Sequence, residues 1–304
     1  MNMYVGITDV NWYESLKDKK FKEICFIKPA GNINFRALKR DELFLFKLHS
    51  PQNFIVGGGY FLCYSNVPSF MLWDIFNDRT GALNEQELNE RLKGSSGEEN
   101  RDFSELNTGC IVLADPFFFK EEQWIPIPED WNSNIGHGKV YNIYKGIGRE
   151  LYAKLQQNLS EEALPKEQEH TGVFVASGPQ HALGEGAFQL MVMEAYKRSC
   201  AITGYRVLPA LETAYIKPLS KGGTKTLDNG ILLRRDLRPL FDLGYITISE
   251  DYTILISSKL KEHFASGSAY LKYHEKSLKA MPERFFELPN KENLKWHREN
   301  VFIK

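Results

Sequence analysis

The chain has 304 residues and nearly balanced charges, with 38 Lys and Arg against 39 Asp and Glu, so its net charge at pH 7 is −1. This balance excludes a uniformly basic nucleic-acid coat protein, although a local basic face remains compatible with it. The length predicts two domains of ordinary size, and an apolar share of 42% is enough for each to build a core.

The first 150 residues carry most of the strand-like sequence. Four runs mix β-branched and aromatic residues between Gly, Pro or Asn boundaries, namely ICFIKP, FLFKLH, NFIVGGGYFLCY and GCIVLADPFFF. Helices are expected at 12–18 and 69–76, and the polar stretch 84–107 predicts a surface helix followed by a loop. The pattern predicts an α+β domain built on a curved β-sheet or barrel, over residues 1–155.

A linker is expected over residues 156–180, because this stretch is charged, contains proline and is poor in large apolar residues. The second domain, residues 181–304, then begins with FQLMVMEAYKRSC, whose apolar spacing predicts a helix. Strand-like pieces follow around Val207 and Tyr215. The remaining elements are expected in NGILLRRDLRPLFDLGYITI, SEDYTILISSKL and the helical ENLKWHRENVF.

The sequence predicts neither a targeting segment nor a cysteine motif. No run of 18 apolar residues predicts a membrane span, and the first 20 residues lack the apolar stretch of a signal peptide. The four cysteines are far apart and form no C-x-x-C pair, which predicts neither a disulfide framework nor a zinc site. We therefore expect a cytoplasmic protein without a membrane partner.

The most informative stretch is 196–248, which reads YKRSCAITGYRVLPALETAYIKPLSKGGTKTLDNGILLRRDLRPLFDLGYITI. It closely resembles the HNH endonuclease family, whose motif reads roughly A-H-I-x-P, then G-G, then N-G-L-L-L, then D-L-H-x-L-F-D. The matching positions include Ile216, Pro218, Gly222, Gly223, Asn229, Gly230, Leu232, Leu233, Asp236, Leu237, Leu240, Phe241 and Asp242. The resemblance implies a ββα-metal (HNH-like) domain that binds and cleaves DNA.

The resemblance also assigns chemistry to three positions. In the family the first His is the general base, the Asn orients the loop that carries it, and the last His ligates a divalent metal. In this sequence the three positions are Tyr215, Asn229 and Arg238. A Tyr hydroxyl, with a pKa of about 10, is a poor base at neutral pH, and a guanidinium has no lone pair for a metal.

No change of register restores a motif histidine, because none of the seven His residues lies between 182 and 262. We therefore expect a degenerate motif with weak or absent cleavage, and no protein-bound metal. The alternative is an active nuclease that holds Mg²⁺ or Mn²⁺ with oxygen ligands such as Asp236 and Asn229, helped by Asp228 or Glu212. His181 would then be an imported base.

The motif region is locally basic, which predicts a grip on DNA phosphates. Between 197 and 238 there are nine Lys and Arg but three Asp and Glu. Arg238 itself is suited to bidentate phosphate binding. The residues expected to contact double-stranded DNA are Lys197, Arg198, Lys217, Lys221, Arg234 and Arg235.

The N-terminal half resembles the front domain of predicted restriction endonucleases that end in an HNH module. The segments TDVNWYESL, FLFKLHSPQNFIVGGGYF, GCIVLADPFFF and WIPIPEDWNSNIGHGKVYN carry this resemblance. The arrangement is also similar to the EVE and SRA readers of the PUA-like class, which flip a modified base into an aromatic cage. The resemblance implies a modified-base pocket formed by Trp12, Asn11, Asn32, Phe46, Ser50 and Asn53. The alternative is that most of these aromatic residues belong to the core.

The sequence is compatible with three functions. The first is a DNA-binding protein of the restriction endonuclease type, acting in defence, that reads modified DNA and cleaves it weakly or not at all. The second is an active metal-dependent endonuclease of modification-dependent (type IV-like) restriction. The third is a nucleotide-sensing regulator. A homodimer is compatible with the first two, because proteins with an HNH module often act as dimers with one active site per strand.

Overall fold

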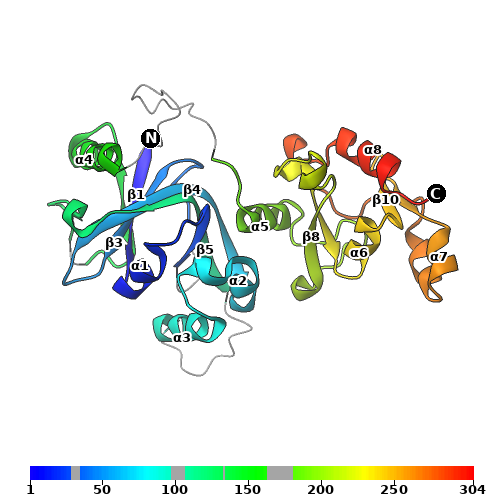
Figure 1. Ribbon diagram of the computed structural model, residues 1–304, viewed down its shortest axis with the longest axis horizontal. Helices are drawn as coiled ribbons and strands as arrows, with labels where there is room; N and C mark the ends of the chain where they lie inside the picture. Colours follow the sequence, from blue (N-terminus) through cyan, green and yellow to red (C-terminus); the bar gives the residue numbers. More distant parts are fainter. Residues whose placement is uncertain (29–34, 97–106, 133, 163–180) are drawn as a thin grey trace. The chain divides into compact units, whose positions relative to one another are not determined.

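Two units make up the structure, Met1–Gly184 and Glu185–Lys304 (Figure 1). The computed structural model describes residues 1–28, 35–96, 107–132, 134–162 and 181–304.

A seven-stranded mixed β-sheet forms the framework of the first unit. In spatial order its strands are β2 (Glu23–Lys28), β5 (Asn107–Phe118), β4 (Phe54–Pro68), β3 (Leu43–Leu48), β1 (Asn2–Thr8) and β7 (Gly138–Asn142), with β6 (Ile125–Pro126) paired to β4. β1 and β3 run parallel, whereas the other neighbours are antiparallel. The sheet is visibly curved in Figure 1. The four strand runs and the α+β class predicted from the sequence are therefore confirmed.

Three helices of the first unit lie where the sequence predicts them, and a fourth, α4, was not predicted. They are α1 (Val10–Leu16), α2 (Ser69–Phe76), α3 (Glu85–Ser96) and α4 (Gly146–Glu162), with 3-10 turns η1 (Asn77–Thr80) and η3 (Glu121–Gln123). The linker predicted over 156–180 begins too early, because residues 156–162 continue α4. Leu155 and Leu159 of this helix pack in the apolar cluster on one face of the sheet. The rest of that stretch, 163–180, lies outside the described residues.

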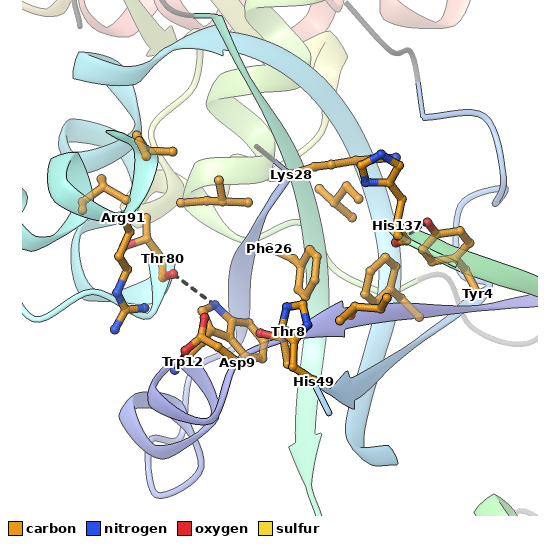
Figure 2. A pocket seen from close by; sticks show the side chains of 17 residues that line it. Tyr4, Thr8, Asp9, Trp12, Phe26, Lys28, His49, Thr80, Arg91 and His137 are labelled. Carbon is orange, nitrogen blue, oxygen red and sulfur yellow. Dashed lines mark hydrogen bonds between the residues drawn. The ribbon is translucent and has the colours of Figure 1, made fainter. Parts of the chain in front are cut away.

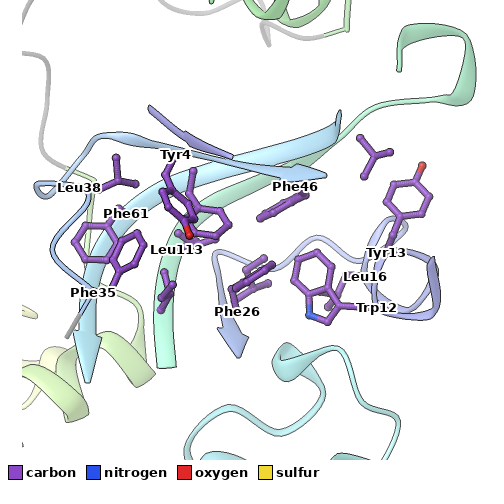
Figure 3. Packing of buried hydrophobic residues seen from close by; sticks show 14 of the residues in the cluster. Tyr4, Trp12, Tyr13, Leu16, Phe26, Phe35, Leu38, Phe46, Phe61 and Leu113 are labelled. Carbon is purple, nitrogen blue, oxygen red and sulfur yellow. The ribbon is translucent and has the colours of Figure 1, made fainter. Parts of the chain in front are cut away.

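The twofold alternation of side chains along the strands gives the sheet two apolar faces. On one face, Met3 and Leu45 pack against Leu155 of α4. On the other face, Phe46 packs with Trp12 of α1 in a cluster that is rich in aromatic rings (Figure 3). Both faces of the sheet are therefore covered, and α1 starts directly where β1 ends.

The second unit is built from short elements around a ββα core. They are α5 (Glu185–Ala195), η4 (Leu208–Ala210), β8 (Leu211–Tyr215), η5 (Leu219–Lys221), η6 (Leu227–Asn229), β9 (Gly230–Arg234), α6 (Leu237–Asp242), β10 (Ile246–Ile248), β11 (Ile254–Ile256), α7 (Lys259–His263), η7 (Gly267–Tyr273), η8 (Phe285–Glu287) and α8 (Lys291–Asn300). β8 and β9 form an antiparallel hairpin and α6 follows them, which is the predicted ββα order. The strand expected near Val207 is wrong, because that residue precedes the 3-10 turn η4.

Cys25 and Cys110 form a disulfide between β2 and β5, so the prediction from the cysteine spacing that no disulfides form is wrong for this pair. The antiparallel register places Cys25 opposite Val112 and Ile27 opposite Cys110, so the two cysteines lie close together on adjacent strands. Their separation of 85 residues hides this proximity in the sequence. Among the helices in the described ranges, none combines the length and the apolar character needed to cross a membrane.

Candidate functional site

Asn229 is fully buried and holds the loop between β8 and β9 in one conformation. Its Oδ1 accepts a hydrogen bond from the backbone N–H of Lys217 at 2.9 Å, and its Nδ2 donates to the carbonyls of Lys217 and Thr224 at 2.9 and 2.8 Å. Asn293 of α8 donates to the same Oδ1 at 3.0 Å. A Cβ at Gly223 would lie 1.9 Å from the Lys217 carbonyl, so the close approach requires glycine there. The loop is thus fixed from inside by a satisfied amide.

Tyr215 stands at the end of β8 and is held by α5. Its hydroxyl donates to Oε2 of Glu185 at 2.9 Å, and its ring stacks on Phe188 with 4.3 Å between ring centres. Lys225 approaches the same Glu185 oxygen at 3.3 Å. Sequence reasoning missed Glu185, which precedes the motif. Its spacing of three residues from Phe188 was the available signal, because such residues share one side of a helix.

Arg238 lies between two carboxylates. Its Nη1 forms an ion pair with Glu212 of β8, and its Nε lies 3.4 Å from Oδ2 of Asp242, one turn further along α6. Burial raises the pKa of Asp242, and the negative charge of Glu212 raises it further, while Arg238 acts in the opposite direction. The guanidinium therefore offsets the repulsion between the two carboxylates.

The atoms at the three motif positions do not fit a divalent cation. The Arg238 guanidinium carries a positive charge and no lone pair. The Tyr215 hydroxyl is bonded to Glu185, and the Asn229 amide is used by the loop. Over the described part of the chain, no group of three or more His, Cys, Asp or Glu side chains is arranged to hold a metal ion.

Asp236, the alternative metal ligand, is also occupied. Its Oδ1 accepts from Nε of Arg234 at 2.6 Å, and its Oδ2 accepts from the Tyr270 hydroxyl at 3.0 Å. The hydrogen bond from Arg234 is the main reason that the pKa of this carboxyl is lowered.

Several of the basic side chains expected to contact DNA have acidic partners. Lys197 pairs with Glu283, Arg198 lies 2.6 Å from Glu194, and Arg234 is bound to Asp236. Two of these three acidic partners, Glu283 and Glu194, come from outside 197–238, so the tertiary structure offsets part of the excess seen in the motif region.

The remaining predicted contacts are less constrained. Lys217 lies over the ring of Trp296, with Nζ 5.6 Å from the ring centre. Lys221 and Arg235 are exposed, and neither takes part in an ion pair within the described residues. The second unit as a whole contains 19 Lys and Arg against 14 Asp and Glu, whereas the first contains 19 against 25. The two units thus carry equal numbers of basic residues, but the second has a net charge of +5 and the first of −6 because acidic residues are fewer in the second.

A cavity of about 550 Å³ opens in the first unit beside the junction of β1 and α1 (Figure 2). Its walls include the aromatic rings of Tyr4, Trp12, Phe26 and Phe44. Trp12 is fixed there, because its Nε1 donates to the Thr80 carbonyl at 3.1 Å. Burial raises the pKa of Tyr4 to about 12, so its hydroxyl stays protonated.

Polar groups reach the same cavity from several directions. Its polar lining consists of Thr8, Asp9, Lys28, His49, Thr80, Arg91 and His137. In Figure 2, Arg91 and Thr80 lie on one side, and Lys28 and His137 on the other. Burial lowers the pKa of Lys28, which reflects the apolar walls around it. The arrangement offers flat apolar walls together with hydrogen-bonding groups at the edges.

The predicted base-pocket residues do not all meet at this cavity. Trp12 lines the cavity, but Phe46 does not. Phe46 is fully buried in the core and contacts the Trp12 ring, with 4.9 Å between ring centres. Asn11 is exposed on α1. Asn53 accepts from Nζ of Lys47 at 2.8 Å.

The two remaining members of that predicted set are Ser50 and Asn32. Ser50 is exposed and does not line the cavity. Asn32 lies outside the described residues. Sequence reasoning missed His49 and His137, because neither has a metal-ligand partner at short spacing in the sequence. The available signal was that both lie in the segments that carry the resemblance of the N-terminal half.

His181, the proposed imported base, is engaged within the first unit. Its ring stacks on Tyr60 at 3.9 Å between ring centres, and its Nδ1 lies 2.9 Å from Oδ2 of Asp115. Its backbone N–H donates to Asp41 at 3.0 Å. These contacts fix the end of the connecting segment on the first unit.

The ββα unit, the buried asparagine that closes its loop and the helix that follows define a nuclease-type domain. Residues 200–249 match the HNH endonuclease family, and the second unit therefore carries a domain of that family. No curated protein sequence matches the chain.

Among solved structures, the chain is similar to the ASCH protein of Zymomonas mobilis, with 10% identity, a TM-score of 0.31 and coverage of 50% of this chain and 94% of that one. It is also similar to the modification-dependent TagI restriction endonuclease, with 12% identity, a TM-score of 0.30 and coverage of 97% and 81%. These likenesses are slight, and the functional proposal rests on the family match and on the residues of this chain.

Proposed function

We propose that this protein binds DNA as a restriction-type HNH protein with little or no cleavage. We further propose that its first unit binds a flipped base and prefers DNA in which that base is modified. The observation that carries the proposal is the state of the motif in an otherwise complete HNH domain. The loop-closing Asn229 is fully hydrogen-bonded. The motif read from the sequence assigns the base position to Tyr215 and the metal-ligand position to Arg238, and the contacts of these two side chains with carboxylates support a site without a bound metal.

Binding without cleavage follows from the chemistry of these groups. Phosphodiester hydrolysis in the family needs a general base and a Lewis acid, and neither a neutral phenol nor a guanidinium supplies them well. Arg238 is engaged by Glu212 and Asp242 and is not free to bind phosphate, but the exposed cations Lys221 and Arg235 still attract it. The net positive charge of the second unit supports a DNA-binding role.

The cavity supports the base-reading half of the proposal. A flipped base requires apolar faces for stacking and polar groups that bond to its edge. Trp12 and Phe26 provide such faces, and His49, His137 and Lys28 provide donors and acceptors. The cost of extruding a base is a few kcal/mol, which stacking and edge contacts of this kind can offset.

The test compares three DNA duplexes of one sequence, which contain unmodified, 5-methylated or 5-hydroxymethylated cytosine. Binding is measured by fluorescence anisotropy in EDTA, and cleavage of matching plasmids is measured in Mg²⁺ and in Mn²⁺. The proposal predicts salt-dependent binding that is tighter for a modified duplex, with no cleavage. Binding that ignores every modification would refute the base-reading half alone.

Active cleavage is the second candidate function, and one observation favours it. The carboxylate of Glu185 lies 2.9 Å from the Tyr215 hydroxyl, and in this candidate function Glu185 is the general base. Cleavage that Glu185→Gln abolishes would establish this candidate. Tight binding of a mononucleotide together with weak, salt-independent DNA binding would instead favour a nucleotide-sensing regulator.

A further inference from the structure

We propose that Arg238 is the resident cation of the HNH domain and takes the place of a divalent metal ion. The inference rests on the family match of residues 200–249 and is independent of whether the domain binds DNA.

The geometry of the three charged groups carries the inference. Glu212 extends from β8 and Asp242 from α6, so the two carboxylates belong to the strand and the helix that an HNH domain must hold together. The guanidinium of Arg238 contacts both, through Nη1 and through Nε. A single positive group thus bridges the strand and the helix.

The charges explain why this bridge is needed. Without a cation, Glu212 and Asp242 would face each other as like charges across the space that the guanidinium now fills. Burial is the main reason that the pKa of Asp242 is raised, and the charge of Glu212 raises it further. An arginine is always protonated and is attached to the chain, so it provides the compensation without any ion from solution.

The same geometry predicts a latent metal site. The side chains of Arg238, Glu212 and Asp242 are 34%, 42% and 48% exposed, so ions from solution can reach them. Removal of the guanidinium would leave two carboxylates directed at one space, and Mg²⁺ and Mn²⁺ favour such oxygen ligands. The native chain should therefore ignore these ions, whereas a chain without the Arg238 side chain should bind them.

The experiment uses the full chain and Mn²⁺ alone, without DNA. Binding is measured by electron paramagnetic resonance, and thermal unfolding is followed in EDTA and in Mn²⁺. Arg238→Ala is expected to unfold roughly 5 °C lower in EDTA and to recover most of that loss in Mn²⁺. Arg238→Lys, which keeps a cation, should behave like the native chain. Adding Glu212→Gln to Arg238→Ala should abolish the recovery.

Two results would overturn the proposal. One is Mn²⁺ binding by the native chain that Glu212→Gln removes, because the metal would then share the site with Arg238. The other is an Arg238→Ala variant that folds and gains nothing from Mn²⁺. If that variant does not fold, the native chain and the Glu212→Gln variant are compared instead. The proposal predicts equal Mn²⁺ binding by these two chains, and weaker binding by Glu212→Gln would overturn it. Since no DNA is present, failure here is distinct from failure of the proposed function.

Discussion

The hydroxyl of Tyr215, at the end of β8, donates a hydrogen bond to Glu185, with 2.9 Å between the oxygens. Lys225 adds a positive charge at 3.3 Å from the same Glu185 oxygen. Tyr215 is therefore a hydrogen-bonded phenol beside a carboxylate, and Arg238 is held in a second cluster by Glu212 and Asp242.

Restoring both histidines should restore chemistry if the scaffold is otherwise intact. The double variant Tyr215→His with Arg238→His is expected to nick supercoiled plasmid in Mn²⁺ at least about 100-fold faster than the native chain, because general-base catalysis is worth that much. Neither single variant should reach this rate. Glu185→Gln in the double variant should slow nicking, since Glu185 would orient the new imidazole. An inert double variant that is folded would show that the site is reshaped.

Acidification should destabilise the second unit through His297, which is 2% exposed and stacks on Phe241 at 4.0 Å between ring centres. Burial lowers its pKa from 6.5 to about 4. Between these values the unfolded chain takes up a proton that the native chain does not, so the free energy of unfolding falls as the pH drops from 6.5 toward 4.

The full effect is roughly 3 kcal/mol, because each pKa unit corresponds to about 1.4 kcal/mol. Chemical unfolding at several pH values measures it. His297→Gln should be less stable at pH 7 but should show a flatter pH dependence over this range. An equally steep dependence in the variant would assign the effect to other groups.

Substitution of the two exposed histidines at the cavity should affect recognition and not folding. His49→Ala and His137→Ala are each expected to change the free energy of unfolding by less than about 0.5 kcal/mol. Each should lower the preference for modified over unmodified DNA by up to tenfold, through loss of a polar contact. Asn11→Ala is the matched control, because Asn11 is exposed nearby but does not line the cavity. A larger effect at Asn11 would favour the pocket predicted from the sequence.

The salt dependence of binding should identify the phosphate contacts in the second unit. Lys221→Ala and Arg235→Ala are each expected to weaken binding to all sequences and to reduce the salt slope by about one. Lys197→Ala should have a smaller effect, because Glu283 already neutralises that side chain. Equal effects for the three variants would show that the ion pair opens when DNA binds.

Four of the seven strands of the first unit, the ββα order and the HNH resemblance could be predicted from the sequence, because these depend on local alternation and on residues close together in the chain. Asn229 was identified in this way, and its bonds to Lys217 span 12 residues. The predicted start of the linker, at residue 156, was wrong because α4 continues to Glu162. The exposed side of this amphipathic helix is polar, and polar composition is also typical of linkers.

Tertiary structure alone decided which charged and polar groups meet. Glu212 reaches Arg238 across 26 residues, and the cavity brings His137 to the region of Trp12 across more than a hundred. Such contacts follow from strand order and register, which place distant segments side by side without leaving a mark in local sequence. For that reason the sequence could point to an HNH domain with altered chemistry, but only the fold could show Arg238 held between two carboxylates.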